Sequence, residues 1–174
     1  MTGPGQRPLL FLDVDGPLIP FGATPEELPD GYPTYGTRPD ANPLLARIDP
    51  GLGPRLLALP CELVWATTWM DDANEWVAPR TGLPDLPVVA WPDPYEEESP
   101  RERIHWKTRA LVDFAAGRPF AWVDDEITTA DRTWVTAHHP GRSLLHRVDP
   151  HFGLTPADFA TLAAWLRGPA HDRP

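Results

Sequence analysis

Short apolar runs alternate with amphipathic stretches along this chain, a pattern that is typical of strands alternating with helices in an α/β fold. The apolar runs predict strands over residues 9–13, 62–67, 86–91, 120–124 and 143–148. The amphipathic stretches predict helices over residues 49–59, 71–78, 103–116, 128–138 and 155–166. We therefore expect a Rossmann-like three-layer sandwich, in which helices cover both faces of a central, mostly parallel sheet.

Two of the expected helices begin with clear local signals. Thr155 suits the N-cap, Pro156 suits the first helical position, and Asp158 stands three residues after the cap. These residue types at this spacing are typical of a capping box at a helix start. Asp49 followed by Pro50 predicts a second helix start for the same reasons.

A long segment rich in proline and glycine, residues 16–42, separates the first expected strand from the first expected helix. Its composition predicts a loop or a small hairpin. The chain has 174 residues, which suits one domain with a normal core. We therefore expect a single domain over residues 1–174, with this segment as a flap.

The composition narrows the classes of function. The formal net charge is -10, which disfavours general binding to nucleic acid or to an anionic membrane, because both need a basic surface. Cys61 is the only cysteine, which excludes an intramolecular disulfide and predicts a small core residue. The apolar run at residues 9–12 is too short for a signal peptide or a membrane span. We expect a cytoplasmic protein with no membrane partner.

Polar residues follow three of the expected strands at the point where each strand ends. In open α/β sheets, ligands bind outside the carboxyl ends of the strands. Lys107, on the helix that leads into the fourth expected strand, is a further candidate for the same rim. The strand-end candidates are Asp13, Asp15 and Gly16, then Thr67 and Thr68, and then Asp124 and Asp125.

The carboxylates of Asp13 and Asp15 raise a question of charge. Side chains two residues apart in a strand point to the same face, and two such charges at ~4 Å repel by about 4 kcal/mol at an effective dielectric near 20. Asp124 and Asp125 add to the negative charge, and Lys107 alone does not balance it. We therefore expect a bound divalent cation, and the hard oxygen ligands favour Mg²⁺.

Four segments together resemble the motifs of the haloacid dehalogenase (HAD) superfamily, in the family's order. They are LFLDVDGPL, LVWATTW, HWKTRAL and FAWVDDE, and they cover residues 9–126. The neighbouring ATTW and VDDEIT resemble an actinobacterial-type branch of that superfamily. The resemblance implies a HAD-like phosphatase rather than a dehalogenase, because dehalogenases resemble this pattern without the second aspartate. The short interval between the first two motifs resembles members with a minimal cap or flap.

The resemblance also implies roles for the matching residues. Asp13 would be the nucleophile that attacks phosphorus, and Asp15 the general acid that protonates the leaving group and later activates water. Thr67 would hydrogen-bond the phosphoryl oxygens, and Lys107 would neutralise the charge on Asp13 and on the phosphoryl group. The implied phosphate-binding residues are Thr67, Thr68, Lys107 and Gly16.

The implied metal ligands are the Asp13 carboxylate, the Asp15 main-chain carbonyl and a carboxylate of the Asp124–Asp125 doublet. We favour Asp125 as the direct ligand, with Asp124 orienting the surrounding groups. The residue types suit the chemistry independently of the resemblance, because phosphoryl transfer depends mainly on positioning and on charge stabilisation.

We therefore expect a magnesium-dependent phosphomonoester hydrolase that acts on a phosphorylated substrate through an aspartyl-phosphate intermediate. One alternative is a nucleic-acid end phosphatase, which the acidic charge disfavours. Another is a module that binds a phospho-ligand without turnover, and a third is a phosphotransferase or mutase. The sequence specifies neither the substrate nor the oligomeric state.

Several other residues allow two interpretations. His105 and Trp69 suit either a contact with substrate or ordinary packing, and Arg109 is the alternative to Lys107 as the cation of the site. His138 and His139 could bind metal, but a position near a helix C-terminus is more typical of dipole or solvent contacts. The acidic loop at residues 93–100 is typical of a solvated segment.

Overall fold

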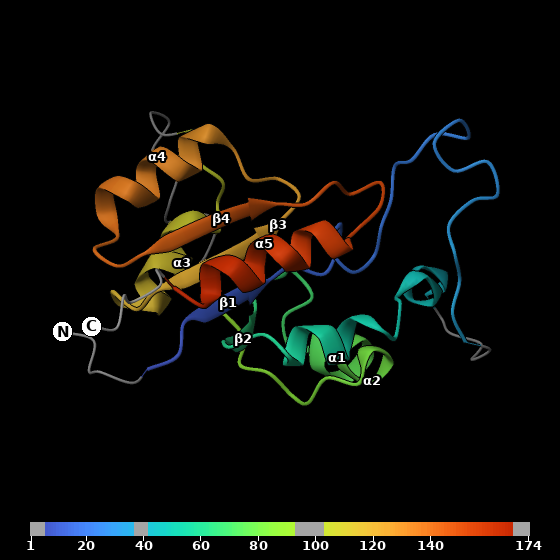
Figure 1. Ribbon diagram of the computed structural model, residues 1–174, viewed down its shortest axis with the longest axis horizontal. Helices are drawn as coiled ribbons and strands as arrows, with labels where there is room; N and C mark the ends of the chain where they lie inside the picture. Colours follow the sequence, from blue (N-terminus) through green and yellow to red (C-terminus); the bar gives the residue numbers. More distant parts are fainter. Residues whose placement is uncertain (1–5, 37–41, 93–102, 169–174) are drawn as a thin grey trace, which may run out of the picture.

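A four-stranded sheet forms the centre of the computed structural model, which describes residues 6–36, 42–92 and 103–168. The strands lie in the order β2-β1-β3-β4, and each neighbouring pair is parallel. Figure 1 shows helices on either side of the sheet. The expected α/β architecture is confirmed and is compatible with a Rossmann-like fold. The strands are β1 (Leu9–Leu12), β2 (Glu62–Trp65), β3 (Phe120–Asp124) and β4 (Ser143–Arg147).

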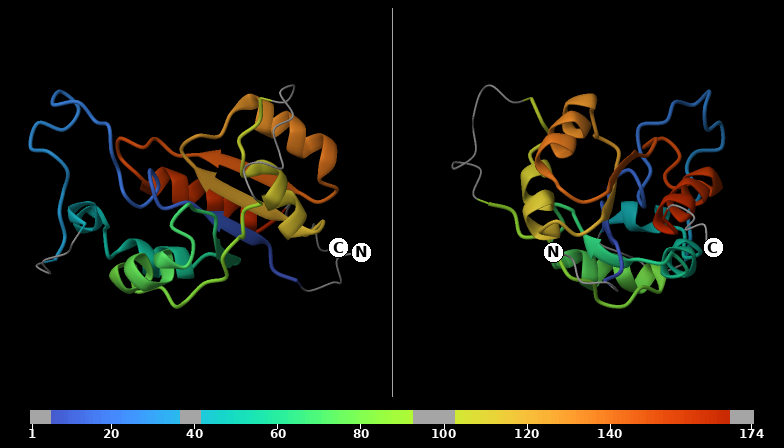
Figure 2. Two further views of the ribbon diagram at one scale, coloured as in Figure 1. Left: turned by 180° about the vertical axis from the view of Figure 1, so that it is seen from behind. Right: turned by 60° about the vertical axis from the view of Figure 1, so that its left-hand side comes forward.

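The helices form a layer on each face of the sheet, as the two views of Figure 2 show. One face is covered by α3 (Thr108–Ala115) and α4 (Thr129–His138). The other face is covered by α1 (Leu52–Leu57), α2 (Ala78–Thr81) and α5 (Pro156–Leu166). A parallel sheet needs this double cover, because its strands are apolar on both faces.

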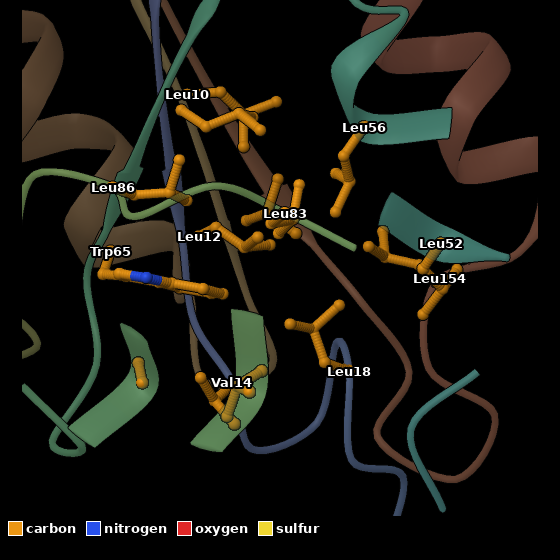
Figure 3. Packing of buried hydrophobic residues seen from close by; sticks show 14 of the residues in the cluster. Leu10, Leu12, Val14, Leu18, Leu52, Leu56, Trp65, Leu83, Leu86 and Leu154 are labelled. Atoms are coloured by element: carbon orange, nitrogen blue, oxygen red, sulfur yellow. The ribbon is translucent and has the colours of Figure 1, made fainter. Parts of the chain in front are cut away.

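β1 is an inner strand of the sheet and is buried along its whole length. Leu9 and Phe11 belong to the cluster that packs against α3 and α4. Leu10 and Leu12 belong to the opposite cluster, which also contains Leu56 of α1 (Figure 3). Each such side chain contributes roughly 1.5–3 kcal/mol when fully buried. The polar residues that follow β1 are therefore held at the end of a firmly packed strand.

The predicted strand over residues 86–91 is wrong. Only an isolated bridge forms there, between Val88 and Trp65 at the end of β2. Trp65 donates to the carbonyl of Pro87, and its own carbonyl accepts from Val89. Pro87 has no N–H, and Pro84 and Pro92 flank the run, so a longer ladder of hydrogen bonds cannot develop.

Two helices differ from the predictions for local reasons. α1 begins only at Leu52, because Asp49 accepts a hydrogen bond from Gly51 (2.7 Å) and so closes a turn before the helix. The helix predicted over residues 71–78 is a π-helical turn, η2 (Ala73–Val77), followed by α2. Pro79 in the first turn of α2 lacks the N–H that a continuous helix needs.

The starts of α4 and α5 agree with the predictions. Thr128 and Thr155 are the N-caps, and each forms a capping box with the aspartate three residues later. None of the helices in the described part of the chain is long and apolar enough to cross a bilayer.

The segment after β1 is a loop over residues 16–36, and its only ladder contact is a bridge between Ile19 and Asp15. It leads to a short 3-10 helix, η1 (Pro43–Arg47). Figure 1 shows the loop reaching beyond the ends of the strand arrows. Arg47 donates to the carbonyl of Pro20 (2.9 Å), and Glu27 pairs with His151 (3.0 Å). These contacts fasten the loop to neighbouring segments, and residues 37–41 and the acidic run 93–100 lie outside the described residues.

Candidate functional site

The carboxyl ends of β1 and β3 lie side by side at the point where the chain connections change direction across the sheet. The chain leaves β1 for β2 on one side, and later enters β3 on the other side of β1. Asp13 directly follows β1, and its backbone N–H donates to the carbonyl of Val123 in β3 (3.1 Å). Asp124 is the last residue of β3. In open α/β sheets this switch point is where a ligand-binding crevice forms.

Lys107 joins these two strand ends through its side chain. Its Nζ lies 3.1 Å from Asp13 Oδ2 and 2.8 Å from Asp124 Oδ2. Lys107 is 3% exposed, Asp13 7% and Asp124 0%, so the three charges interact with little screening by water. Lys107 is also the only lysine of the chain, among 15 lysines and arginines. Its rival Arg109 instead places its guanidinium 5.1 Å from the ring centre of Trp134.

The electrostatics of this group follow from its burial. Burial raises the pKa of Asp13 to about 7, with Lys107 opposing the shift and the charge of Asp124 adding to it. Burial alone lowers the pKa of Lys107, but the attraction of Asp13 and Asp124 outweighs it, and the net shift of this pKa is upward. The ammonium therefore stays charged, and two carboxylates compete for it.

Asp125 lies beside this group and packs against Gly16. Burial and, to a smaller extent, the charge of Asp124 together raise the pKa of Asp125 to about 6. Gly16 has φ +95°, and a Cβ on it would lie 2.8 Å from the Cγ of Asp125. Gly16 therefore permits both the turn and the close approach of the carboxylate. Its backbone N–H donates to the carbonyl of Ile19 (3.0 Å).

The residues present suit a divalent cation. Asp13, Asp124 and Asp125 each offer a carboxylate oxygen, and these atoms lie within 4.8 Å of one another. Carboxylate oxygens are ligands that Mg²⁺ accepts. Burial is the main cause of the raised pKa values of Asp13 and Asp125, and the charge of Asp124 contributes to both. A second group, His105, Asp124 and Glu126, shares Asp124 with the first.

Asp15 has a different partner from Asp13. β1 ends at Leu12, so the strand geometry expected to set the two carboxylates side by side does not extend to them. Asp15 Oδ2 accepts a hydrogen bond from Trp69 Nε1 (3.0 Å). The two carboxylates thus lie in separate hydrogen-bonding environments, one with an ammonium and the other with an indole N–H.

Thr67 and Thr68 follow β2 and differ in exposure. Thr67 is fully buried, and its Oγ1 accepts from the backbone N–H of Trp69 (3.2 Å). A hydroxyl that accepts this bond keeps its own proton for donation to a ligand. Thr68 is exposed. Met70 has φ +51°, which is uncommon for a residue with a side chain, so the turn after Thr67 has a tightly defined backbone.

Asp131 is the residue that the sequence analysis missed. It is fully buried, and its Oδ1 accepts from the backbone N–H of His105 (2.6 Å) and from Thr108 Oγ1 (2.8 Å). Its Oδ2 accepts from the backbone N–H (2.8 Å) and the Oγ1 (2.7 Å) of Thr128. Asp131 thereby links the start of α4 to the turn that carries Lys107.

These bonds also explain why α3 begins at Thr108 and not near residue 103. The backbone N–H of His105 is bonded to Asp131, and that of Lys107 donates to His105 Nδ1 (3.2 Å). Both groups are therefore committed to side chains, and the turn holds Lys107 before the helix starts. A Thr-x-x-Asp start at residues 128–131 is visible in the sequence, but the partners of the second carboxylate oxygen are not.

The remaining candidates have other partners. His105 Nε2 lies 2.9 Å from Glu126 Oε2. His138 Nδ1 lies 2.8 Å from the carbonyl of Trp134, on whose ring it stacks. Cys61 is buried as expected, and burial raises the pKa of its thiol to about 12. Such a thiol is inert as a nucleophile.

Comparison with protein-family models, with curated proteins and with solved structures finds no match for this chain. The chemistry of the site therefore rests on its own residues and geometry.

Proposed function

We propose that this protein is a magnesium-dependent phosphomonoester hydrolase that acts through an aspartyl-phosphate intermediate. The observation that carries the proposal is the buried contact of Lys107 with both Asp13 and Asp124 at the switch point of the sheet. Phosphoryl transfer needs a nucleophile, a cation beside it and positioned donors. The resemblance of the four motifs to the HAD superfamily, with a minimal cap, supports the same proposal.

The chain's own residues suffice to describe the proton and bond changes. The Asp13 carboxylate attacks phosphorus, and the bond from phosphorus to the leaving oxygen breaks while Asp15 gives that oxygen a proton. Asp15 then takes a proton from water, whose oxygen attacks the same phosphorus. The bond to Asp13 breaks and inorganic phosphate leaves. Lys107 favours the ionised form of Asp13 and attracts the phosphoryl oxygens, and Thr67 and Thr68 supply hydroxyl donors.

Asp13, Asp124 and Asp125 are the carboxylates that would hold the metal ion, together with the main-chain carbonyl of Asp15. We favour Asp125 as the direct ligand because it is only partly buried, whereas Asp124 is fully buried and orients Lys107 (2.8 Å) and the backbone of Glu126 (3.0 Å). When bound, Mg²⁺ supplies positive charge that offsets the carboxylates and the phosphoryl oxygens.

Hydrolysis of p-nitrophenyl phosphate by the purified protein tests the proposal. We expect turnover that a chelator abolishes and Mg²⁺ restores. Asp13→Asn should abolish turnover, whereas Asp113→Asn, the same change at an exposed position of α3, should not alter it. Rapid quenching with a phosphorus-labelled ester should trap label on the wild-type protein and none on Asp13→Asn.

Full activity after exhaustive removal of metal would contradict the metal dependence, and label retained by Asp13→Asn would contradict the assigned nucleophile. Binding of phosphate esters without any turnover would favour the alternative of a binding module. Selective hydrolysis of oligonucleotide ends would favour a nucleic-acid end phosphatase.

A further inference from the structure

Three of the eight tryptophans contact the residues assigned to phosphoryl transfer. Trp69 donates its indole N–H to Asp15 Oδ2 (3.0 Å), and Trp91 donates its indole N–H to the carbonyl of Thr67 (3.1 Å). The ring centre of Trp106 lies 5.5 Å from Lys107 Nζ. These tryptophans come from three separate segments, after β2, after the bridge at Val88 and before α3.

Trp91 and Trp106 form one aromatic surface. Their ring centres are 4.9 Å apart in an edge-to-face arrangement, and His105 stacks on Trp106 with ring centres 5.4 Å apart. Such contacts restrict the rings, so little side-chain entropy remains to be lost when a ligand binds. Trp106 is nevertheless 46% exposed. A rigid, half-exposed indole beside a buried ammonium gives an apolar surface next to the point where a phosphoryl group would bind.

From this arrangement we infer that Trp106, supported by Trp91, is a platform for the leaving group of the substrate. The inference rests on the proposed phosphatase function and names its substrate class, which is phosphomonoesters that carry a planar aromatic ring close to the phosphate. Lys107 binds the phosphoryl end beside the nucleophile Asp13, and the ring of the ester packs on the indole. A planar ring stacks favourably on the face of an aromatic side chain. An aliphatic ester of equal size gains less, because it lacks the flat face and the polarised ring edge.

Benzyl phosphate and cyclohexylmethyl phosphate form a matched pair of test substrates. Both release a primary alcohol, so their leaving groups have similar acidity, and they differ in the aromatic ring. We expect kcat/KM to be about tenfold higher for benzyl phosphate, which corresponds to about 1.4 kcal/mol. Adenosine 5'-monophosphate against ribose 5-phosphate tests whether a nucleoside supplies the ring.

Two tryptophan variants make the test specific to the platform. Trp106→Leu should reduce the benzyl preference to about onefold. Trp76→Leu should keep the wild-type ratio, because Trp76 has nearly the same exposure, 45%, but lies on η2. Equal kcat/KM values in the wild type, or a preference that survives in Trp106→Leu, would overturn the inference.

A binding experiment separates this inference from the proposed function. Benzylphosphonate and cyclohexylmethylphosphonate cannot be hydrolysed, and calorimetry measures their affinities without turnover. A tenfold preference for benzylphosphonate that Trp106→Leu removes supports the platform even if no ester is hydrolysed. Equal affinities would overturn the platform while leaving hydrolysis of p-nitrophenyl phosphate as the test of the phosphatase proposal.

Discussion

The starts of α4 and α5 use the same local motif but serve different parts of the molecule. In α4 the N-cap Thr128 and Asp131 form a capping box, and in α5 Thr155 and Asp158 form the same box. Asp131 accepts from both the N–H and the Oγ1 of Thr128 (2.8 and 2.7 Å). Asp158 accepts from the same two groups of Thr155 (2.7 and 2.7 Å). The two helix starts are nearly identical in their own hydrogen bonds.

The difference lies in the second oxygen of each carboxylate. Asp131 Oδ1 accepts from the backbone of His105 and from Thr108, which flank Lys107. Asp158 Oδ1 lies 2.7 Å from His146 Nε2, on β4. One box therefore braces the turn that carries the cation of the site, and the other braces a strand. A capping motif predicts a helix start. What else the aspartate of the motif stabilises depends on the partner of its second carboxylate oxygen, which the capping box does not use.

The largest loss of activity should come from removing the ammonium of Lys107, which lies on the turn that the capping box of α4 supports. Lys107→Met leaves the buried carboxylates of Asp13 and Asp124 without their ammonium. Loss of one preorganised charge at a developing phosphoryl charge should lower kcat by about 10²–10³-fold. Hydrolysis of p-nitrophenyl phosphate at saturating Mg²⁺ measures the loss, and circular dichroism checks the fold. A folded variant that keeps a tenth of the wild-type kcat would show that Lys107 is not part of the catalytic machinery.

The second largest effect is expected when the two capping boxes are compared through the stability and kcat of Asp131→Asn and Asp158→Asn. An asparagine turns an amide NH₂ toward donors that need an acceptor, so both variants lose the half of the capping box that the aspartate side chain makes and should lose about 1 kcal/mol of stability. For a chain of this size the melting temperature should fall by about 2–4 °C in each. Only Asp131→Asn also releases the turn at residues 105–108, and its kcat should fall about tenfold or more.

A single lysine allows the position of Lys107 to be followed without turnover. In protein labelled with ¹⁵N-lysine, the one side-chain ammonium signal belongs to Lys107, and its burial should protect its protons from exchange with water. Asp131→Asn should shift or weaken this signal, and Asp158→Asn should leave it unchanged. The same loss of kcat in both variants, or an unchanged ammonium signal in Asp131→Asn, would show that Asp131 acts only in the capping box of α4.

The comparison also explains how far the sequence could predict this molecule. The strands over β1 and β3 and the starts of α4 and α5 were predictable, because apolar runs and capping residues act locally. The candidate residues after β1 and β3 were predictable as well, since parallel strands end at the same edge. The bridge at Val88 was overpredicted as a strand, because periodicity does not count the N–H groups that proline removes.

The partners of Asp131, Trp91 and Trp106 could not be read from the sequence. The contacts that matter join segments far apart in the chain, such as His105 with Asp131 and Thr67 with Trp91. Local patterns carry no information about which distant backbone group meets a free carboxylate or indole. The sequence did single out Lys107, because it is the one lysine among 15 lysines and arginines. Lysine and arginine are not interchangeable, so this position is a candidate for a role that arginine cannot fill.

The third effect contrasts the pH dependence of the site with that of the boxes in metal-free protein. Burial raises the pKa of Asp13 to about 7, so its contribution to stability is present below its ordinary value of 3.8 and is lost as the pH rises through about 7. Burial raises the pKa of Asp158, but hydrogen bonds from Thr155 and His146 outweigh it, and the net shift is downward. Its contribution is therefore present above pH 3.8 and is lost at lower pH.

The two substitutions should consequently have opposite signs. In the presence of a chelator at pH 8, Asp13→Asn should raise the melting temperature by about 2–4 °C, and near pH 4 the gain should disappear. Asp158→Asn should lower the melting temperature at pH 8, with a smaller loss near pH 3. A destabilising Asp13→Asn at pH 8 without metal would contradict the view that burial disfavours the charged form of Asp13.

The smallest effect concerns the pH dependence of stability and arises at the C-terminal ends of the same two helices. α4 ends at the C-cap His139, which is 6% exposed, and α5 ends at the C-cap Arg167, which is exposed. Burial lowers the pKa of His139, and a backbone interaction with Arg118 offsets only part of the shift. Stability is therefore complete above the ordinary histidine value of 6.5 and is lost as the pH falls, because the unfolded chain then binds the proton more readily. The guanidinium of an arginine does not titrate near neutral pH. Between pH 7.5 and 5.5, His139→Gln should reduce the acid-induced loss of unfolding free energy by at most about 1 kcal/mol, as measured by urea denaturation. Arg167→Gln should leave the loss at its wild-type value, and an unchanged loss in His139→Gln would mean that the acid sensitivity arises elsewhere in the chain.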